Sequence, residues 1–582
     1  MMEATTAKLR DLRLPLLLFA AALVIGLIAT TLVQHPDNDP ASRYIPMIRE
    51  MAAGNWDRAF HPRIQPLFIL VGAGFASLGL TPFAAAKAAS VLFYALTVFP
   101  AYWLYRRFFA PREMLWGLLY CLSFPYLLRY SLVGLRDSAN TFFIVCLAVG
   151  LVAFYRDRRW TAVAGTALAA AGMTLTRGES VVHAGLGLAL LAGMALLAPA
   201  ADRRRDLAKV AGGILLFAIA ISPWVIYCQR TTGWPVTAAQ EIPALRKLEQ
   251  ISSIRLHGES RLPEGKAIQP TAAPAAPVLS SPQELEPATA TSKPTLFSFK
   301  ETLGVIPFYL ALAAAGMLLR RRRGAWSKEE NLLLGLFIGI EVIIICLVCG
   351  TGGDYLGKRY LGGAMPLVLG WAGVAMTALW AWIQQTLVSP LWRWPALLAC
   401  VVSLTSGTWD GLTPARWGLT PKKQERWKGE IEAAAWIQKH GTEQIASGDT
   451  PLASTLLLYH NGQMPILFGG KAASRIAGLS GADMLIPEKG SIWDLETLRG
   501  HGRTTRLHFL IWNSELASIC PELQDPERLP PDLVICGRGG SGKYPIIILG
   551  FRPEKKGGDS KYRGLRGWGV LPMRQLLRAA IH

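Results

Sequence analysis

The sequence predicts a polytopic α-helical membrane protein with about eleven transmembrane helices and a C-terminal extracytoplasmic α/β domain. The first observation is composition: of the 582 residues, 51% are hydrophobic and only 17% are charged, whereas a soluble protein carries roughly a quarter charged residues. The second is length. Apolar runs of about 20 residues, enough to cross a hydrocarbon core of roughly 30 Å, recur between Leu14 and Trp409. The third is the placement of the positive charges.

The expected spans are 14–33, 83–105, 113–128, 138–155, 160–175, 181–198, 207–227, 302–320, 330–350, 360–383 and 394–409. Basic residues precede the first span, but no small-residue cleavage site stands before His35, which indicates a retained helix rather than a signal peptide. The segment 66–80 is apolar but short and Gly-rich. We expect it to form an interfacial or re-entrant helix, because a further span there would move every later basic cluster to the opposite face.

The formal charge of +20 would suit nucleic-acid binding, but its distribution indicates membrane topology instead. The basic clusters fall at alternate helix ends, at 8–13, 106–112, 156–159, 203–205 and 320–323. Because basic loops stay in the cytoplasm, the N-terminus is expected there, and the loops after spans one, three, five, seven and nine are expected outside. We therefore expect a multi-pass protein of the inner (plasma) membrane with no nucleic-acid partner.

The composition divides the chain into three regions. Residues 1–410 form the expected transmembrane domain, with an outer loop at 34–82 and a Pro-, Ala-, Ser- and Thr-rich outer stretch at 258–298 that is predicted to be disordered. Residues 420–551 form the expected extracytoplasmic α/β domain, and residues 552–582 form a basic tail. Within the α/β domain we expect an amphipathic helix at 430–439 and strands at 464–468, 507–512, 532–535 and 544–551.

Two features of the α/β domain have competing interpretations. Cys520 and Cys536 could pair in an oxidising compartment, and the sequence leaves this disulfide open. The run from Gly537 to Lys543 fits G-x-x-x-x-G-K, but Tyr544 replaces the Ser or Thr that binds metal, and a strand rather than a helix is expected to follow. A Gly-rich hairpin is therefore the expected structure, and no nucleotide is expected to bind.

The loop after the first span carries two acidic residues, Asp37 and Asp39, in the run D-N-D-P-A-S-R-Y, and R-E-M-A-A-G-N-W follows at 49–56. This loop resembles the first outer loop of the GT-C glycosyltransferases. The nearest are glycosyltransferase family 39, which includes protein O-mannosyltransferases, and the bacterial transferases that add aminoarabinose to lipid A. Those families usually show an adjacent Asp-Glu pair closer to the Tyr, whereas here Asn38 separates the acids and Asp39 lies five residues before Tyr44. The other interpretation is that both acids solvate the loop or cap the helix that follows.

The resemblance implies that an acidic residue of this loop acts as a general base or helps to bind a divalent metal. It assigns the base to Asp39 first and to Asp37 second. In the second outer loop, Asp137 matches an acidic residue that contributes to the site in these families, and it is also a first-turn acid of the next span. The candidate catalytic residues are therefore Asp39, Asp37 and Asp137, and Asp39 and Asp137 are the candidate ligands of Mg²⁺ or Mn²⁺.

Four basic residues at outer helix ends are the candidates for contact with a lipid phosphate: Lys87, Arg177, Lys358 and Arg359. Lys87 occupies the place of a basic residue common in the resembling families, and Arg359 belongs to an R-Y-x-x-x-x-x-P pattern similar to one that opens a late span there. The guanidinium group is planar and suits phosphate oxygens. The other interpretation is that these side chains only extend to the membrane interface.

The resemblance covers roughly residues 14–410 and implies a transferase that moves a sugar from a polyprenyl-phosphate donor to an acceptor at the outer face, with inversion at the anomeric carbon. The acceptor is a lipid, a glycan or a protein, and the sequence identifies neither it nor the sugar. Two alternatives stay open. Glu341, within the ninth span, favours a lipid or solute transporter or flippase, and the altered acid spacing favours a catalytically inactive scaffold.

Overall fold

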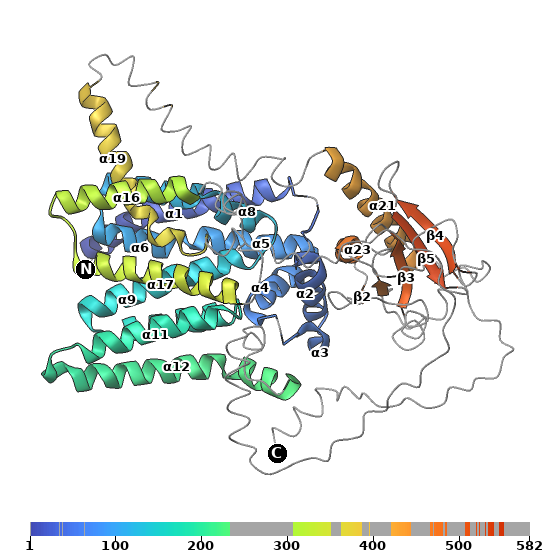
Figure 1. Cartoon of the computed structure of the whole chain (residues 1–582), viewed down its shortest axis with the longest axis horizontal. Coiled ribbons are helices and arrows are strands. Elements are labelled where there is room, and N and C mark those ends of the chain that lie inside the picture. Colours follow the sequence, from blue (N-terminus) through green and yellow to red (C-terminus); the bar gives the residue numbers. More distant parts are fainter. Residues whose placement is uncertain are drawn as a thin grey trace, which may run out of the picture.

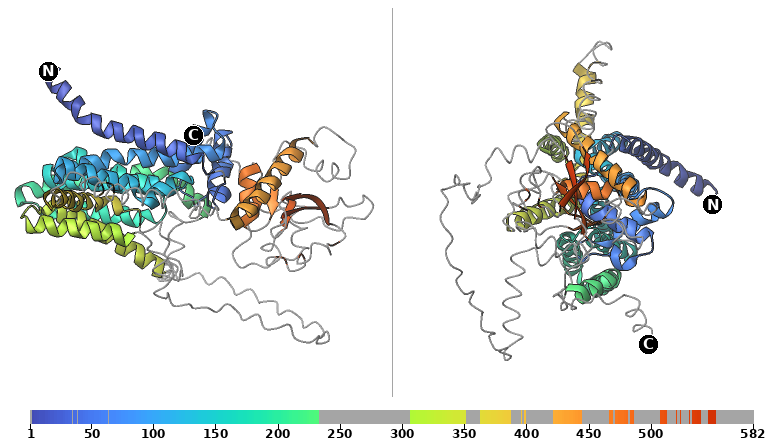
Figure 2. Two further views of the ribbon diagram at one scale, coloured as in Figure 1. Left: turned by 90° about the horizontal axis from the view of Figure 1, so that it is seen from above. Right: turned by 90° about the vertical axis from the view of Figure 1, so that its right-hand side faces the viewer.

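The computed structural model describes residues 2–33, 35–37, 39–62, 64–232, 306–350, 362–386 and 421–443, and from the C-terminal region 466–468, 471–480, 483–485, 507–512, 533–539 and 546–551, with isolated positions 395, 398, 520, 523 and 530. Along its long axis the molecule has a bundle of long helices, then a group of short helices, then a small α/β domain (Figure 1). A view from above gives the same order, and the α/β domain lies beyond one end of the bundle (Figure 2).

The bundle consists of apolar helices, which are α1 (Met2–Thr30), α5 (Pro82–Leu96), α6 (Val98–Phe108), α7 (Pro111–Ser123), α8 (Pro125–Leu132), α9 (Asp137–Asp157), α10 (Trp160–Thr174), α11 (Ser180–Leu196), α12 (Ala200–Thr232), α16 (Ile306–Arg322), α17 (Lys328–Gly350), the short 3₁₀ helix η2 (Met365–Leu367) and α19 (Leu369–Thr386). Four described segments are each long and apolar enough to cross a membrane: Leu12–Thr30, Pro82–Phe108, Asp137–Asp157 and Ala200–Thr231. The protein is a multi-pass α-helical membrane protein, as the composition predicts.

One expected span, 113–128, is two helices in the structure. Pro125 disfavours helical backbone at the residue before it, and Phe124 is extended, with φ −62° and ψ 116°. Helix α7 therefore ends at Ser123, and α8 runs on to Leu132, beyond the expected end. The prediction of one helix is wrong here, because the proline redirects the chain. The expected span at 360–383 begins later, at Leu369, and the span at 394–409 lies almost wholly outside the described residues.

The basic clusters lie together at one end of the bundle, as the charge pattern predicts. Ion pairs join their helix ends: Arg107 to Asp157 at 3.7 Å, Arg158 to Asp206 at 3.3 Å, and Arg323 to Glu113 at 3.6 Å. These contacts link the ends of α6 and α9, of α9 and α12, and of α16 and α7. We call this the arginine end.

The short helices lie at the opposite end of the bundle. They are the π-helix η1 (Pro40–Tyr44), α2 (Ile45–Ala52), α3 (Trp56–Ala59) and α4 (Pro66–Ser77). Helix α4 has twelve residues, so it is about 18 Å long and too short to cross a bilayer, in agreement with the expectation for 66–80. The backbone N–H of Leu67 donates to the carbonyl of Leu175 at 3.0 Å, which joins α4 to the loop between α10 and α11.

The α/β domain contains a five-stranded sheet in the order β2-β1-β3-β5-β4, against which helices α21 (Pro421–Glu443) and α23 (Lys471–Ser480) pack. Its strands are β1 (Ile466–Phe468), β2 (Asp483–Leu485), β3 (Leu507–Trp512), β4 (Leu533–Gly539) and β5 (Ile546–Phe551). The pairs β1–β2 and β1–β3 are parallel, and β3–β5 and β4–β5 are antiparallel.

The sequence predicted β1, β3, β4 and β5, which overlap the four expected strands. It missed β2 and α23, which are a three-residue strand and a ten-residue helix. The expected hairpin is confirmed, because β4 and β5 pair up to Gly539 opposite Ile546 and a strand follows the Gly-rich run. Cys536 lies in β4 and Cys520 is buried, and the structure has no disulfide bond at either of them, so the pairing that the sequence left open is not formed here. The stretch 258–298 and the tail 552–582 lie outside the described residues.

Candidate functional site

A buried group of charged residues lies at the end of the bundle where η1 packs. Arg177, in the loop between α10 and α11, donates from Nη1 to Asp137, the first residue of α9. Its Nε donates to Oε1 of Glu179 at 2.7 Å, and its Nη2 contacts the same carboxylate. Arg177 is 4% exposed and Asp137 is 7% exposed, so these charges interact with little screening by water.

Arg136 lies beside this group and binds uncharged oxygens. Its Nη1 donates to Oε1 of Gln65 at 2.6 Å and to the carbonyl of Thr176 at 3.3 Å. The guanidinium group also lies over the ring of Tyr44, 5.8 Å from the ring centroid. Arg136 therefore joins the start of α9 to α4, to η1 and to the loop after α10.

Tyr44, on η1, is buried near the charged residues of the predicted site. Burial raises the pKa of its phenol, and the negative charges of Asp39 and Asp137 raise it further, while Arg136 and Arg177 act in the opposite direction. The phenol therefore stays protonated at physiological pH and lies within electrostatic reach of all four charged groups. Asp137 and Arg177, which the sequence nominated from separate loops, are in direct contact, and Asp39, from a third loop, is near enough to Tyr44 to act on the same phenol.

Glu179 stays ionised in this group. Burial alone would raise its pKa, but the adjacent Arg177 and Arg136 outweigh burial and lower the pKa to about 2. The group described so far is therefore a network of two arginines and two carboxylates, Asp137 and Glu179, to which Asp39 adds a further acid.

The two acids of the first loop differ in setting. Asp37 is exposed, and its backbone carbonyl accepts the N–H of Ala41 at 3.0 Å. Asp39 is half-buried and stands at the N-cap position of η1, but its side chain makes no capping hydrogen bond. Asp39 therefore occupies the capping position, but its carboxylate does not cap the helix. A π-helix follows it, a conformation that is often found at functional sites.

The predicted phosphate-binding residues differ in the groups that they contact. The Nζ of Lys87 donates to the carbonyls of Thr30 and Val33, both at 2.9 Å, at the end of α1. These bonds use two of its three N–H groups. Arg177 contacts two carboxylates, as described above. Lys358 and Arg359 lie outside the described residues.

The described residues do not fit the predicted Mg²⁺ or Mn²⁺ site. Within the described part of the chain, no group of three or more His, Cys, Asp or Glu side chains gathers that could hold a metal ion. Asp137, one of the two predicted ligands, is instead paired with Arg177. A guanidinium group on a carboxylate disfavours a second cation at the same oxygens, because like charges repel.

A cavity of about 20 Å³ extends from the Arg177 group into the bundle. Its polar lining includes Asn140, Ser180 and His183, and Ser180 Oγ donates to Asn140 Oδ1 at 2.7 Å. His183 is 2% exposed, and neither of its ring nitrogens has a hydrogen-bond partner among the described residues. A space of this size holds about one water molecule. The cavity therefore continues the polar surface of the site but is too small for a sugar.

The sequence did not nominate several residues of the site. Glu179 stands two positions after Arg177, and Arg136 is next to Asp137, so proximity along the chain was an available signal for both. No comparable signal existed for Gln65, because its contact with Arg136 joins residues 71 positions apart. Only the tertiary structure, which places the start of α4 beside the start of α9, shows it.

Comparison with solved structures shows the fold. The crystal structure of ArnT from Cupriavidus metallidurans in the apo state superposes with a TM-score of 0.58 at 13% identity, over 92% of this chain and 97% of that one. The structure of the same protein bound to undecaprenyl phosphate gives 0.54 at 14% identity, with the same coverage. The apo oligosaccharyltransferase of Archaeoglobus fulgidus gives 0.48 at 12% identity, over 85% of this chain and 69% of that chain.

The chain has the fold of ArnT. The similarity extends over nearly the whole of both chains, so the bundle, the short helices and the α/β domain all belong to the shared architecture. At this level of identity the likeness shows the fold alone. No protein-family model matches the sequence, and a comparison with curated proteins finds no match.

Proposed function

We propose that this GT-C protein is a glycosyltransferase that moves a sugar from a polyprenyl-phosphate donor to an acceptor at the η1 end of the bundle. The observation that carries the proposal is the buried group at the η1 end, in which Arg177 binds Asp137 and Glu179, and Arg136 lies over Tyr44, five residues after Asp39. Acids and arginines at a membrane surface are the groups that a proton-removing, phosphate-releasing reaction needs. The structure of ArnT bound to undecaprenyl phosphate supports the choice of donor class.

The proposed reaction is a single displacement. The acceptor hydroxyl oxygen attacks the anomeric carbon and forms the new C–O bond, while the bond from that carbon to the phosphate oxygen breaks and its electron pair leaves with polyprenyl phosphate. The hydroxyl proton passes to the carboxylate of Asp39, which is half-buried and not used for capping. Attack opposite the leaving group inverts the anomeric carbon. Asp37 is the second candidate for the base.

Asp137 and Arg177 position the site in this proposal. The carboxylate of Asp137 is neutralised by Arg177, whose other nitrogens are engaged by Glu179. An acid paired in this way is a weak base, so Asp137 is given a positioning role rather than proton removal. The pair fixes the start of α9, and thereby Arg136, beside Tyr44.

Arg136 is the best-placed cation for the leaving phosphate among the described residues. The hydrogen bonds that it makes go to the uncharged oxygens of Gln65 and Thr176, so no carboxylate contact offsets its positive charge directly. Lys87 keeps one N–H for substrate, and Lys358 and Arg359 stay candidates from the undescribed segment. The proposal therefore extends the predicted phosphate set to include Arg136.

We also propose the orientation of the chain. The arginine end carries the clustered basic helix ends and faces the cytoplasm under the positive-inside rule. The η1 end and the α/β domain then face outward, where a lipid-linked sugar donor presents its sugar. We place the chain in the inner membrane in this orientation.

The direct test uses the purified full-length chain in lipid nanodiscs, given a panel of radiolabelled undecaprenyl-phosphate sugars with membrane lipids and envelope glycans as acceptors. Release of undecaprenyl phosphate together with a labelled product supports the proposal. Movement of the intact donor across a vesicle membrane without cleavage supports the transporter alternative. Neither outcome, from a folded protein over the whole panel, supports the inactive scaffold and overturns the transferase.

One observation favours the transporter as the second candidate. Glu341, on α17, has both carboxylate oxygens buried with no hydrogen-bond partner among the described residues. A carboxyl group within a transmembrane helix is a common element of proton and ion pathways. The vesicle experiment above, repeated with Glu341→Gln, separates a transport role from a packing role, because only the former changes translocation.

A further inference from the structure

The loop that carries Asp37 and Asp39 is in direct contact with the α/β domain. His35, which precedes both acids, lies with its Nε2 2.8 Å from Oε2 of Glu430 on α21. Both side chains are almost fully buried, at 1% and 0% exposed. The His35 ring also stacks on Trp427 of α21, with centroids 4.7 Å apart and planes 3° from parallel. Burial at both partners shows that this is a packed interface.

Two oxygens face the two ring nitrogens of His35. Nδ1 lies 3.0 Å from the carbonyl of Pro36, and Nε2 is within ion-pair distance of the Glu430 carboxylate, although the angles there do not meet the criteria for a hydrogen bond. Both oxygens are acceptors, so each ring nitrogen lies against an acceptor at a buried position.

Arg475, on α23, completes this contact from the other side of Glu430. Its Nε donates to Oε2 at 2.7 Å and its Nη2 donates to Oε1 at 2.6 Å, in a bidentate arrangement. Burial alone would raise the pKa of Glu430, but the bonds from Arg475 and His35 lower it to about 2. Glu430 is therefore ionised at all physiological pH values and links α21, α23 and the loop.

A second contact of the α/β domain lies after Asp39 in the sequence, on the C-terminal side of the two acids. Gly478 of α23 lies against η1 so closely that a Cβ at this position would meet Ala41 Cα at 3.0 Å and Ala41 Cβ at 3.1 Å. Ala41 is fully buried. The domain thus contacts the loop before Asp37, through His35, and after Asp39, through Ala41.

We propose that His35, Glu430 and Arg475 are positioning residues of the site, through which the α/β domain sets the place of the Asp39 carboxylate. The α/β domain is then a required part of the site rather than an accessory domain. This inference rests on the proposed function. A displacement of the reacting group by about 1 Å commonly costs about 100-fold in rate, so loosening the contact should lower kcat without a comparable change in KM for the donor.

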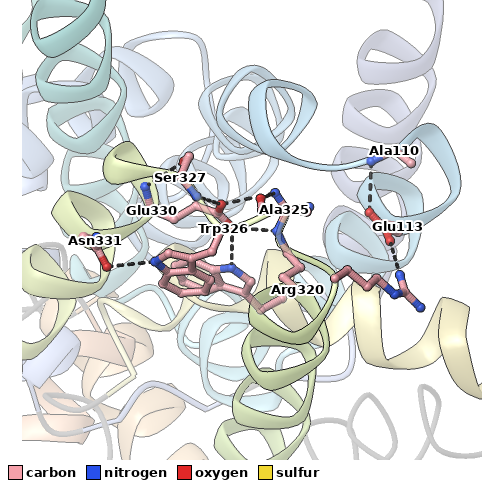
Figure 3. Close-up of polar contacts among 10 residues, drawn as sticks. Ala110, Glu113, Arg320, Ala325, Trp326, Ser327, Glu330 and Asn331 are labelled. Carbon is pink, nitrogen blue, oxygen red and sulfur yellow. Dashed lines mark hydrogen bonds and ion pairs between the residues drawn. The ribbon is translucent and has the colours of Figure 1, made fainter.

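The experiment compares Glu430→Gln with a matched control, Glu330→Gln, in the full-length chain in nanodiscs. Glu330 lies at the arginine end and is also fully buried, with Arg320 donating to its two oxygens at 2.7 and 3.1 Å (Figure 3). Ser327 N–H also donates to it, at 2.8 Å. The two glutamates thus share residue type, burial and a bidentate arginine, but only Glu430 contacts the acidic loop.

Two readouts are measured on each variant: hydrogen–deuterium exchange of the peptide covering 35–44, and kcat and KM for the labelled donor. We expect Glu430→Gln to raise exchange in this peptide and to lower kcat about 10- to 100-fold with KM within about twofold, while Glu330→Gln leaves both unchanged per folded molecule. Should Glu430→Gln not fold, Arg475→Lys replaces it, because lysine retains the charge and loses only the bidentate fork.

The outcomes distinguish a failure of the positioning role from a failure of the proposed function. Raised exchange with unchanged kcat overturns the positioning role, and so does unchanged exchange. If the wild-type chain releases no undecaprenyl phosphate from any donor, the proposed function fails. The exchange measurement then still decides whether the domain fixes the loop.

Discussion

Replacing Arg177 by Met tests whether the buried charge network is a structural requirement of the site. The substitution keeps the apolar stem and removes the guanidinium group from Asp137, which is 7% exposed, and from Glu179. Breaking a buried ion pair by removing one partner commonly costs about 3–5 kcal/mol, because the remaining charge is left buried without compensation. Arg177 serves two carboxylates, so we expect the loss to lie in this range, a change of at least about 100-fold in the unfolding equilibrium.

The assay is reversible unfolding of the purified chain in mixed micelles, followed by circular dichroism as a denaturing detergent is added. Arg43→Met is the control, because Arg43 is exposed on η1, and its loss should stay within about 0.5 kcal/mol. Adding Asp137→Asn to Arg177→Met should recover part of the stability, since it removes the uncompensated charge. A loss below about 1 kcal/mol for Arg177→Met, or no recovery in the double variant, would refute the reasoning.

Three further predictions concern other carboxylates. Asp39→Asn should lower kcat about 10²–10⁴-fold in the donor-cleavage assay, with Asp202→Asn at the exposed start of α12 as the matched control, and full activity would exclude Asp39 as the base. The pKa of Glu430 is depressed to about 2 from 4.5, so its contribution to stability is present above about pH 4.5 and is lost as the pH falls toward 2. The difference in Tm between wild type and Glu430→Gln should therefore shrink from about pH 7 to about pH 3, and a difference that grows would contradict the buried ion pair. Glu341→Gln should leave donor cleavage unchanged and raise the Tm, because it replaces a buried acid without a described partner by a neutral side chain. Loss of transport or cleavage in that variant would assign Glu341 a function.

The local features of the chain were predictable because each depends on near neighbours. Apolar runs identify the bundle helices, and the Gly-rich run before an apolar strand identifies the β4–β5 hairpin. The break at Phe124 was also readable in principle, since Pro125 alone imposes it. The acids Asp39 and Asp137 were nominated because the motifs around them resemble those of known transferases, and such motifs are local in the sequence too.

The partners of these residues were not predictable. Asp137 stands at a helix start in the sequence, but nothing near it indicates that Arg177 pairs with it, 40 residues on. The contact of Arg136 with Gln65 depends on the position of the short helix α4, which the apolar pattern shows only as a non-spanning segment. Such contacts follow from helix packing, and hydrophobic periodicity carries no information about which helices are neighbours.

The sequence by itself determined that this protein is a multi-pass membrane protein. It also determined which helix ends carry the clustered arginines, and that acidic residues lie in the loops at the opposite ends. It could do so because the contrast between lipid and water acts on every residue separately and leaves a pattern along the chain. Only the tertiary structure decided that Arg177 pairs with Asp137 near Tyr44, and that His35 is buried against Glu430. Those contacts join segments from distant parts of the chain, and they exist only once the bundle and the α/β domain have packed together.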